Sequence, residues 1–251
     1  MLKKLLTAAV LSFATAACAQ TFKPEVGQAG KDVVWVPTPD ALVERMLNMA
    51  KVTKNDFVID LGSGDGRIAI AAGKRGARAM GIEYNPNMVE LSNRNAQAAG
   101  VSDRVKFVKA DIFESDFSQA QVITMYLLPH LNVQLRPKIL DMKPGTRVTS
   151  HAFTMEDWKP DETATIEYRD AYLWIVPARV NGKWRVSQVA GSGMETIELD
   201  LAQKYQFFEG KAKLGGRDID VLEGRLAGER ITFTLVDGNG TRRNYTGTVS
   251  G

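Results

Sequence analysis

Apolar residues follow three successive patterns along the chain. A largely apolar run, 5–17, comes first. From about residue 41 to 153, short apolar stretches alternate with segments in which apolar residues recur at helical spacing. After about residue 165 only short stretches typical of strands remain. Strands separated by helices indicate a parallel sheet covered on both faces, whereas strands that follow one another indicate an antiparallel unit.

The middle part predicts five strands and four helices. The strands are expected at 57–61, 78–83, 105–108, 122–126 and 147–153. The helices are expected at 41–47 with Asp40 as the N-cap, and at 67–75, 87–99 and 131–142. An extended segment with Val36, Pro37 and Thr38 precedes the first helix. We expect it to fold over the carboxyl ends of the strands as a lid.

The last part completes this sheet and adds a second unit. Strands expected at 165–177 and 183–189 are assigned to the edge of the first sheet. Strands expected at 205–212, 219–226, 231–236 and 244–249 are assigned to the second unit, and hairpin turns to Asn181-Gly182 and 237–240. The predicted fold class is α/β. It consists of a Rossmann-like seven-stranded sheet over 20–190 and a small C-terminal antiparallel β domain over 191–251.

The first 19 residues have the order of a secretory signal peptide. Lys3 and Lys4 precede the apolar run, and small residues gather at its end. The run is short for a membrane span, and a buried N-terminal helix is the alternative. Cleavage after Ala19 would give a soluble periplasmic or secreted protein, whereas lipid attachment at Cys18 would give a lipoprotein. We therefore expect an exported chain that binds a membrane only if Cys18 is lipidated.

Charge and cysteine content exclude several functions. The 251 residues include 32 basic and 29 acidic side chains, a net charge of +3, and no dense basic tract. No nucleic-acid partner is therefore expected. Cys18 is the only cysteine, so the mature fold has no disulfide, no cysteine zinc site and no cysteine nucleophile. No metal is expected.

A glycine-rich loop between a strand and a helix carries the strongest chemical signal. It reads Asp60-Leu61-Gly62-Ser63-Gly64-Asp65-Gly66. The glycines allow a sharp turn and close approach of a ligand, and amides near a helix N-terminus suit an anionic group. Arg67 stands where a dinucleotide-binding loop needs its third glycine, so the spacing favours S-adenosylmethionine over NAD. A glycine turn without a ligand is the alternative.

Acidic residues at three strand ends fit the same cofactor. Asp60 would favour its cationic amino acid portion. Glu83 lies 23 residues further on and can accept hydrogen bonds from the ribose hydroxyls, or it is merely solvated. Asp111 can accept from the adenine amino group, or it caps a helix, and Ile112 can pack on the adenine ring. The other expected cofactor-binding residues are Gly62, Ser63, Gly64, Gly66 and Tyr126.

Residues 31 to about 160 resemble the class I S-adenosylmethionine-dependent methyltransferases. The resemblance rests on residues 60–68, Glu83, Asp111-Ile112 and Met125-Tyr126-Leu127-Leu128-Pro129. The loop is most similar to bacterial relatives of the protein-lysine methyltransferases that act on mitochondrial proteins such as those of the ATP synthase. The resemblance implies a methyl acceptor that is a protein, with lysine as one candidate, or a small molecule. Methyltransferases of planar nitrogens carry an Asn-Pro-Pro-Tyr-like element after the fourth strand, and Tyr126-Leu127-Leu128-Pro129 departs from it, which argues against an adenine or glutamine acceptor.

Methyl transfer depends on positioning of the acceptor, and it needs a base only when the acceptor arrives as an ammonium. His130 and His151 are candidates for that base, although histidines in such loops are more often structural. Tyr126 is the candidate for lining the acceptor channel, or it is a packing residue. The alternative function is an exported, non-catalytic binding module that keeps the sheet as a scaffold.

Overall fold

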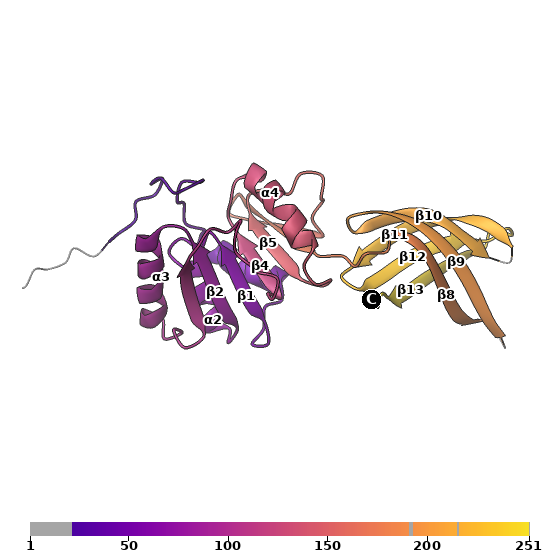
Figure 1. The fold of residues 1–251 in the computed structure, drawn as a ribbon, viewed down its shortest axis with the longest axis horizontal. Coiled ribbons are helices and arrows are strands. Elements are labelled where there is room, and N and C mark those ends of the chain that lie inside the picture. The colour runs from indigo at the N-terminus through magenta and orange to yellow at the C-terminus, as the bar shows by residue number, and fades with distance from the viewer. Residues whose placement is uncertain (1–21, 191–192, 215, 251) are drawn as a thin grey trace, which may run out of the picture.

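The computed structural model describes residues 22–190, 193–214 and 216–250. The expected signal peptide, with Cys18, lies outside the described residues. The described chain forms a seven-stranded mixed sheet with helices, followed by a separate six-stranded antiparallel sheet (Figure 1). No helix among the described residues is long and apolar enough to cross a membrane.

The first sheet is the seven-stranded one that the sequence predicts, with the strand order β3-β2-β1-β4-β5-β7-β6. Its five parallel strands are β1 (Phe57–Leu61), β2 (Arg78–Glu83), β3 (Val105–Lys109), β4 (Val122–Met125) and β5 (Arg147–His151). All four residues of β4 are buried, as the continuous apolar run of a covered parallel strand requires. The order reverses between β1 and β4, and ligands of such sheets bind at the carboxyl ends of the strands at this point.

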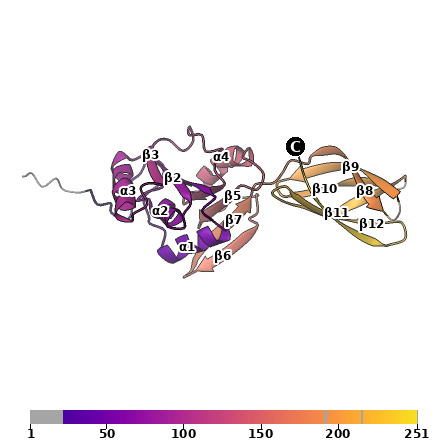
Figure 2. The same ribbon diagram turned by 90° about the horizontal axis from the view of Figure 1, so that it is seen from below.

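Four helices cover the sheet: α1 (Asp40–Met49), α2 (Arg67–Lys74), α3 (Pro86–Ala98) and α4 (Pro129–Leu140). Side chains of α1, α2 and α3 share one apolar core, while α4 packs into a second core that contains Trp158 and Trp174. Figure 2 shows α1 and α4 on opposite sides of the strands β5 and β7. The expected N-cap of the first helix is wrong by one residue, because Pro39 takes the capping position and Asp40 is already helical.

The edge of the sheet is a hairpin that the sequence predicts as a single strand. Strands β6 (Glu162–Ile166) and β7 (Arg169–Ile175) pair antiparallel. Between them Glu167 and Tyr168 have positive φ angles of 48° and 62°. Hairpin turns with positive φ usually carry glycine or asparagine, so no residue in the stretch signals the turn.

The second sheet has the order β13-β12-β11-β10-β9-β8. Its strands are β8 (Gly182–Ala190), β9 (Gly193–Lys204), β10 (Phe207–Leu214), β11 (Arg217–Ala227), β12 (Arg230–Val236) and β13 (Arg242–Thr248). The assignment of 183–189 to the first sheet is wrong, because this strand pairs along its length with β9, which the sequence analysis missed. The change of sheet therefore falls before Gly182 rather than near residue 190. Asn181-Gly182 joins the two sheets instead of forming a hairpin, whereas the turn at 237–240 is confirmed between β12 and β13.

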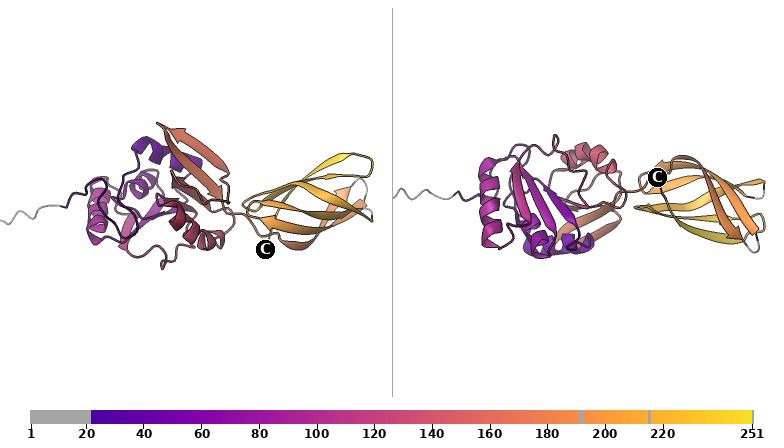
Figure 3. Two further views of the ribbon diagram at one scale, coloured as in Figure 1. Left: turned by 90° about the horizontal axis from the view of Figure 1, so that it is seen from above. Right: turned by 60° about the horizontal axis from the view of Figure 1, so that its bottom comes forward.

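The two sheets meet at the loop 155–161. The ring of Trp158 stacks on that of Tyr205 with centroids 5.8 Å apart. Across the same junction, Arg225 lies 2.9 Å from Oδ1 of Asp161. Figures 1 and 3 show the second sheet at the end of the molecule opposite α3.

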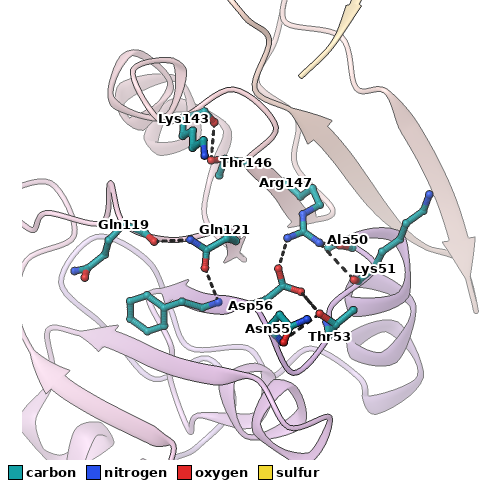
Figure 4. A network of polar contacts seen from close by, with 11 residues as sticks. Ala50, Lys51, Thr53, Asn55, Asp56, Gln119, Gln121, Lys143, Thr146 and Arg147 are labelled. Carbon is teal, nitrogen blue, oxygen red and sulfur yellow. Dashed lines mark hydrogen bonds and ion pairs between the residues drawn. The ribbon is translucent and has the colours of Figure 1, made fainter. Parts of the chain in front are cut away.

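A polar network joins α1 to the amino ends of the central strands (Figure 4). Arg147 donates to the carbonyl of Ala50 at 2.7 Å and forms an ion pair with Asp56. Asp56 also accepts hydrogen bonds from the amide and hydroxyl of Thr53, at 2.7 and 3.0 Å. The network lies at the opposite ends of the strands from the glycine-rich loop, so it stabilises the sheet without contributing to the site.

Candidate functional site

The glycine-rich loop leaves the carboxyl end of β1 and leads into α2. Gly62, Gly64 and Gly66 have positive φ angles of 75°, 55° and 84°, a conformation that other residues rarely adopt. Space is limited as well, because a Cβ atom at Gly64 would lie 2.7 Å from Nε1 of Trp35. Backbone conformation therefore requires glycine at all three positions, and close packing requires it again at Gly64.

A cavity of about 480 Å³ opens over this loop. Its walls come from the glycine-rich loop, the ends of β4 and β5, and the segment 29–38. The expected site residues that line it are Asp60, Gly62, Ser63, Gly64 and Tyr126. The expected lid, Val36 to Thr38, forms part of its wall. Gly66 does not line it and packs instead against Phe107 and Ser92.

Asp60 lies at the base of this arrangement and is 2 % exposed. Its Oδ1 accepts a hydrogen bond of 2.6 Å from the hydroxyl of Thr124. Burial raises the pKa of Asp60 to about 7; the negative charges of Asp65 and Glu83 add to the shift, and the Thr124 hydrogen bond opposes it. A cationic group that enters the cavity would stabilise the ionised form of this carboxyl.

Glu83, Asp111 and Ile112 line a second cavity, whose volume is only about 50 Å³. Glu83 connects β2 to the glycine-rich loop, because its Oε2 accepts from the amide of Gly64 at 3.0 Å and its Oε1 from that of Asn85 at 2.9 Å. Gly62 lines both cavities, so the two adjoin. All three residues that the sequence predicts for the adenosine part of the cofactor are thus brought together.

Both carboxylate oxygens of Asp111 already have partners. Oδ2 accepts from Nζ of Lys31 at 2.6 Å, and Oδ1 accepts from the amide of Phe113 at 2.9 Å. The hydrogen bond from Lys31 is the largest of the effects that hold the pKa of Asp111 below its usual value. The contact with Phe113 is the capping role that we weighed for Asp111, although a turn follows it rather than a helix.

The two histidines occupy different surroundings. His130 is exposed at the start of α4 and lines neither cavity. His151 ends β5 and is 2 % exposed. Its Nδ1 lies 3.0 Å from the hydroxyl of Thr38, and its ring lies against that of Tyr126 with centroids 3.7 Å apart. Burial, helped by the charge of Arg169, lowers the pKa of His151 to about 4, so this imidazole is neutral near pH 7.

Several residues of the larger cavity escaped the sequence analysis. Trp35 and Phe153 line it, and no local motif marks either of them. Arg67, which we used only to exclude NAD, joins the loop to the lid. It donates to both carboxylate oxygens of Asp65 and, at 2.9 Å, to the carbonyl of Thr38. The described residues contain no group of three or more His, Cys, Asp or Glu side chains that could hold a metal ion.

Comparison with known proteins establishes the family. A family model described as the ANTKMT methyltransferase domain matches residues 60–162. A protein-lysine N-methyltransferase of Saccharolobus islandicus is 42% identical over 151 residues, which are 57% of this chain and 94% of that protein. The chain belongs to the class I S-adenosylmethionine-dependent methyltransferases. The resemblance inferred from the sequence is confirmed.

Two further relatives are named for different acceptors. A lysine N-methyltransferase of Mus musculus, named for the C-type subunit of ATP synthase, is 37% identical over 130 residues, and this chain spans about half (52%) of its length. A crystal structure described as an RNA methyltransferase from Salinibacter ruber, in complex with S-adenosylhomocysteine, has 48% identity and a TM-score of 0.57. That match covers 58% of this chain and 96% of the other.

This methyltransferase uses S-adenosylmethionine as its cofactor, and the larger cavity has features that fit it. The glycine-rich loop presents backbone without side chains. The hydroxyl of Ser63 is buried in the loop and has no hydrogen-bond partner among the described residues. Asp60 is a buried carboxyl next to the loop, suited to a cationic ammonium group.

Proposed function

We propose that this methyltransferase modifies the side-chain amine of lysine in a protein. The observation that carries the proposal is the wall of the larger cavity. Trp35, Tyr126 and Phe153 reach it from three separate segments and give it aromatic faces. Aromatic faces attract ammonium groups through cation–π interactions and provide no charge for a phosphate.

The charges around the cavity favour an amine over a nucleic acid. The ionisable residues that line it are Lys31, Asp32, Asp60, Asp65 and Arg67. Arg67 is bound by Asp65, and Lys31 by Asp111. RNA binding relies on basic surface that is available to phosphates, and this lining has more acidic than basic groups. The names of the lysine methyltransferase relatives support the same acceptor.

The proposal also assigns the cofactor-binding residues. S-Adenosylmethionine supplies a methyl group on a positively charged sulfur. We place its amino acid portion at Asp60 and the loop residues Gly62, Ser63 and Gly64. The adenosine portion lies on the side of the smaller cavity, where Glu83 accepts from the ribose hydroxyls, Asp111 accepts from the adenine amino group and Ile112 packs on the ring.

The aromatic wall also prepares the acceptor for reaction. Lysine reacts as a neutral amine, so its ammonium group must first lose a proton. Cation–π attraction brings the ammonium to the mouth of the cavity, and desolvation further inside lowers its pKa, so that the proton is released to water. His151 is not needed as the base, because its Nδ1 already faces the hydroxyl of Thr38.

Labelled S-adenosylmethionine tests the acceptor. The purified protein is incubated with lysine-containing peptides or with total RNA, and the products are hydrolysed and separated. We expect the label in methylated lysine. Phe153→Ala should raise the KM for the peptide without changing the affinity for S-adenosylhomocysteine, whereas Tyr168→Ala, fully exposed at the β6–β7 turn, should change neither. Label in RNA alone would contradict the proposal.

We further propose that the chain is exported and that residues 1–19 are removed, so that it acts in the periplasm or outside the cell. The order of charged, apolar and small residues at the N-terminus supports this. The intact mass of the mature protein tests it, with Gln20 expected as the first residue, and a diacylated Cys18 as the alternative. Retention of Met1 would contradict export.

A further inference from the structure

We infer that Lys31, Asp32 and Val33 are an internal occupant of the adenosine side of the cofactor site, which S-adenosylmethionine must displace in order to bind. The smaller cavity carries this inference. Its volume of about 50 Å³ is far below the roughly 300–1,000 Å³ of pockets that hold small molecules, and these three residues share its lining with Glu83 and Asp111. The inference rests on the proposed placement of adenosine, but not on the identity of the methyl acceptor.

Lys31 lies where a ligand's amino group would bind Asp111. Its Nζ is 2.6 Å from Oδ2 of Asp111 and 3.5 Å from Oδ2 of Asp32. It also lies over the rings of Tyr84 and Phe113, at 5.1 and 5.9 Å from their centroids. Since the amide of Phe113 holds Oδ1 of Asp111, Lys31 and an adenine amino group compete for Oδ2.

The segment that carries Lys31 is held unequally at its two ends. At the far end, the hydroxyl of buried Thr38 bonds to His151, and its carbonyl accepts from Arg67. The near end relies on the pair of Lys31 with Asp111, whose side chains are 34% and 25% exposed. Half-exposed ion pairs contribute little stability and are weakened by salt. Displacement therefore begins at Lys31, while Thr38 keeps the lid attached.

A tight local turn gives the displaced residues a unit that can move as one. The amide of Gly30 donates to the carbonyl of Val33 at 3.0 Å, and the amide of Trp35 donates to the carbonyl of Gln28 at 2.9 Å. Ala29 and Val34 form an isolated antiparallel bridge in the same turn. Because these bonds lie within the segment, movement away from Asp111 does not break them.

Calorimetric titration with S-adenosylhomocysteine tests the inference. Lys31→Ala should bind about 1.5- to 5-fold more tightly than the wild type, which corresponds to removal of a half-exposed ion pair. Lys31→Gln, which keeps the length of the side chain, should show the same direction. The matched control is Lys23→Ala, which removes an exposed lysine earlier in the same segment.

Salt provides a second readout on the same proteins. Raising the ionic strength weakens the Lys31–Asp111 pair, so binding to the wild type and to Lys23→Ala should strengthen relative to Lys31→Ala. Equal affinities and equal salt slopes for all variants would overturn the inference, and weaker binding to Lys31→Ala would show that Lys31 is a cofactor ligand instead. If the wild type does not bind S-adenosylhomocysteine at all, the placement of the cofactor fails rather than the competition.

Discussion

Thr38 and His151 lie 113 residues apart in the chain and share a buried hydrogen bond. Sequence reasoning could name Asp60 and Glu83, because each stands at a fixed offset from a strand end. It could not join Thr38 to His151, because only folding brings the lid to the end of β5. The structure therefore changes the role of His151 from a candidate base to a neutral support for the lid and for Tyr126.

The lowered pKa of His151 predicts how the stability of the protein depends on pH. Its pKa of about 4 in the folded state lies below the ordinary value of 6.5, so the unfolded chain binds more protons between these values. Stability should therefore fall as the pH drops from 6.5 towards 4, with up to about 3 kcal/mol from this residue. Urea unfolding at several pH values measures the fall, which should be smaller in His151→Asn than in His130→Asn. Parallel profiles for the two variants would refute this.

Glu83 gives a prediction for the cofactor. Glu83→Gln removes the charged acceptor that we assign to the ribose hydroxyls, while its amide oxygen can still accept from Gly64. We expect the affinity for S-adenosylhomocysteine to fall by about 1–3 kcal/mol, measured by calorimetry, with little change in melting temperature. Glu90→Gln, on the exposed face of α3, is the control. Unchanged binding would remove Glu83 from the site.

At the scale of elements, strand prediction succeeded where burial on both faces made the apolar runs continuous. Strands β1 and β4 are of this kind. It failed where turns lack their usual residues, as at Glu167-Tyr168, and where a strand alternates acidic and apolar residues. Strand β9 is such a case, because Glu198 and Asp200 face outward between the buried Ile197, Leu199 and Leu201.

The network around Asp56 predicts an effect on stability that is separate from function. Burial alone would raise the pKa of Asp56, but the hydrogen bonds from Arg147 and Thr53 outweigh it and hold the pKa below 3.8. The stabilisation is therefore present above pH 3.8 and is lost as the pH falls through the lower folded value. Asp56→Asn should cost about 1–3 kcal/mol in urea unfolding at pH 7 and leave cofactor affinity unchanged.

Asp103→Asn is the control for that experiment, because its partner Arg104 is the adjacent residue and the pair is exposed. It should have little effect on unfolding. A loss of cofactor binding in folded Asp56→Asn would contradict the view that the two ends of the strands have separate roles.

At the scale of the molecule, binding and the second sheet are separated. The residues that line the two cavities fall between Ala29 and Phe153, and none comes from β8 to β13. The sequence predicted a second antiparallel unit, but it could not show how that unit is attached. The attachment depends on Trp158 and Asp161, which carry no motif and are buried only because the second sheet covers this loop with Tyr205 and Arg225.

Loosening this junction should separate the stabilities of the two sheets. In the double variant Tyr205→Ala and Arg225→Ala, Trp158 loses its stacking partner and buried Asp161 loses its cation, so we expect two unfolding transitions by calorimetry in place of one. Arg230→Ala, an exposed arginine of β12, is the control. Cofactor affinity should not change, because no cavity residue is touched. The KM for the acceptor should rise, because Phe153 lies two residues before the loop 155–161 and depends on its position. A folded double variant that no longer binds S-adenosylhomocysteine would show that the second sheet shapes the cofactor site itself.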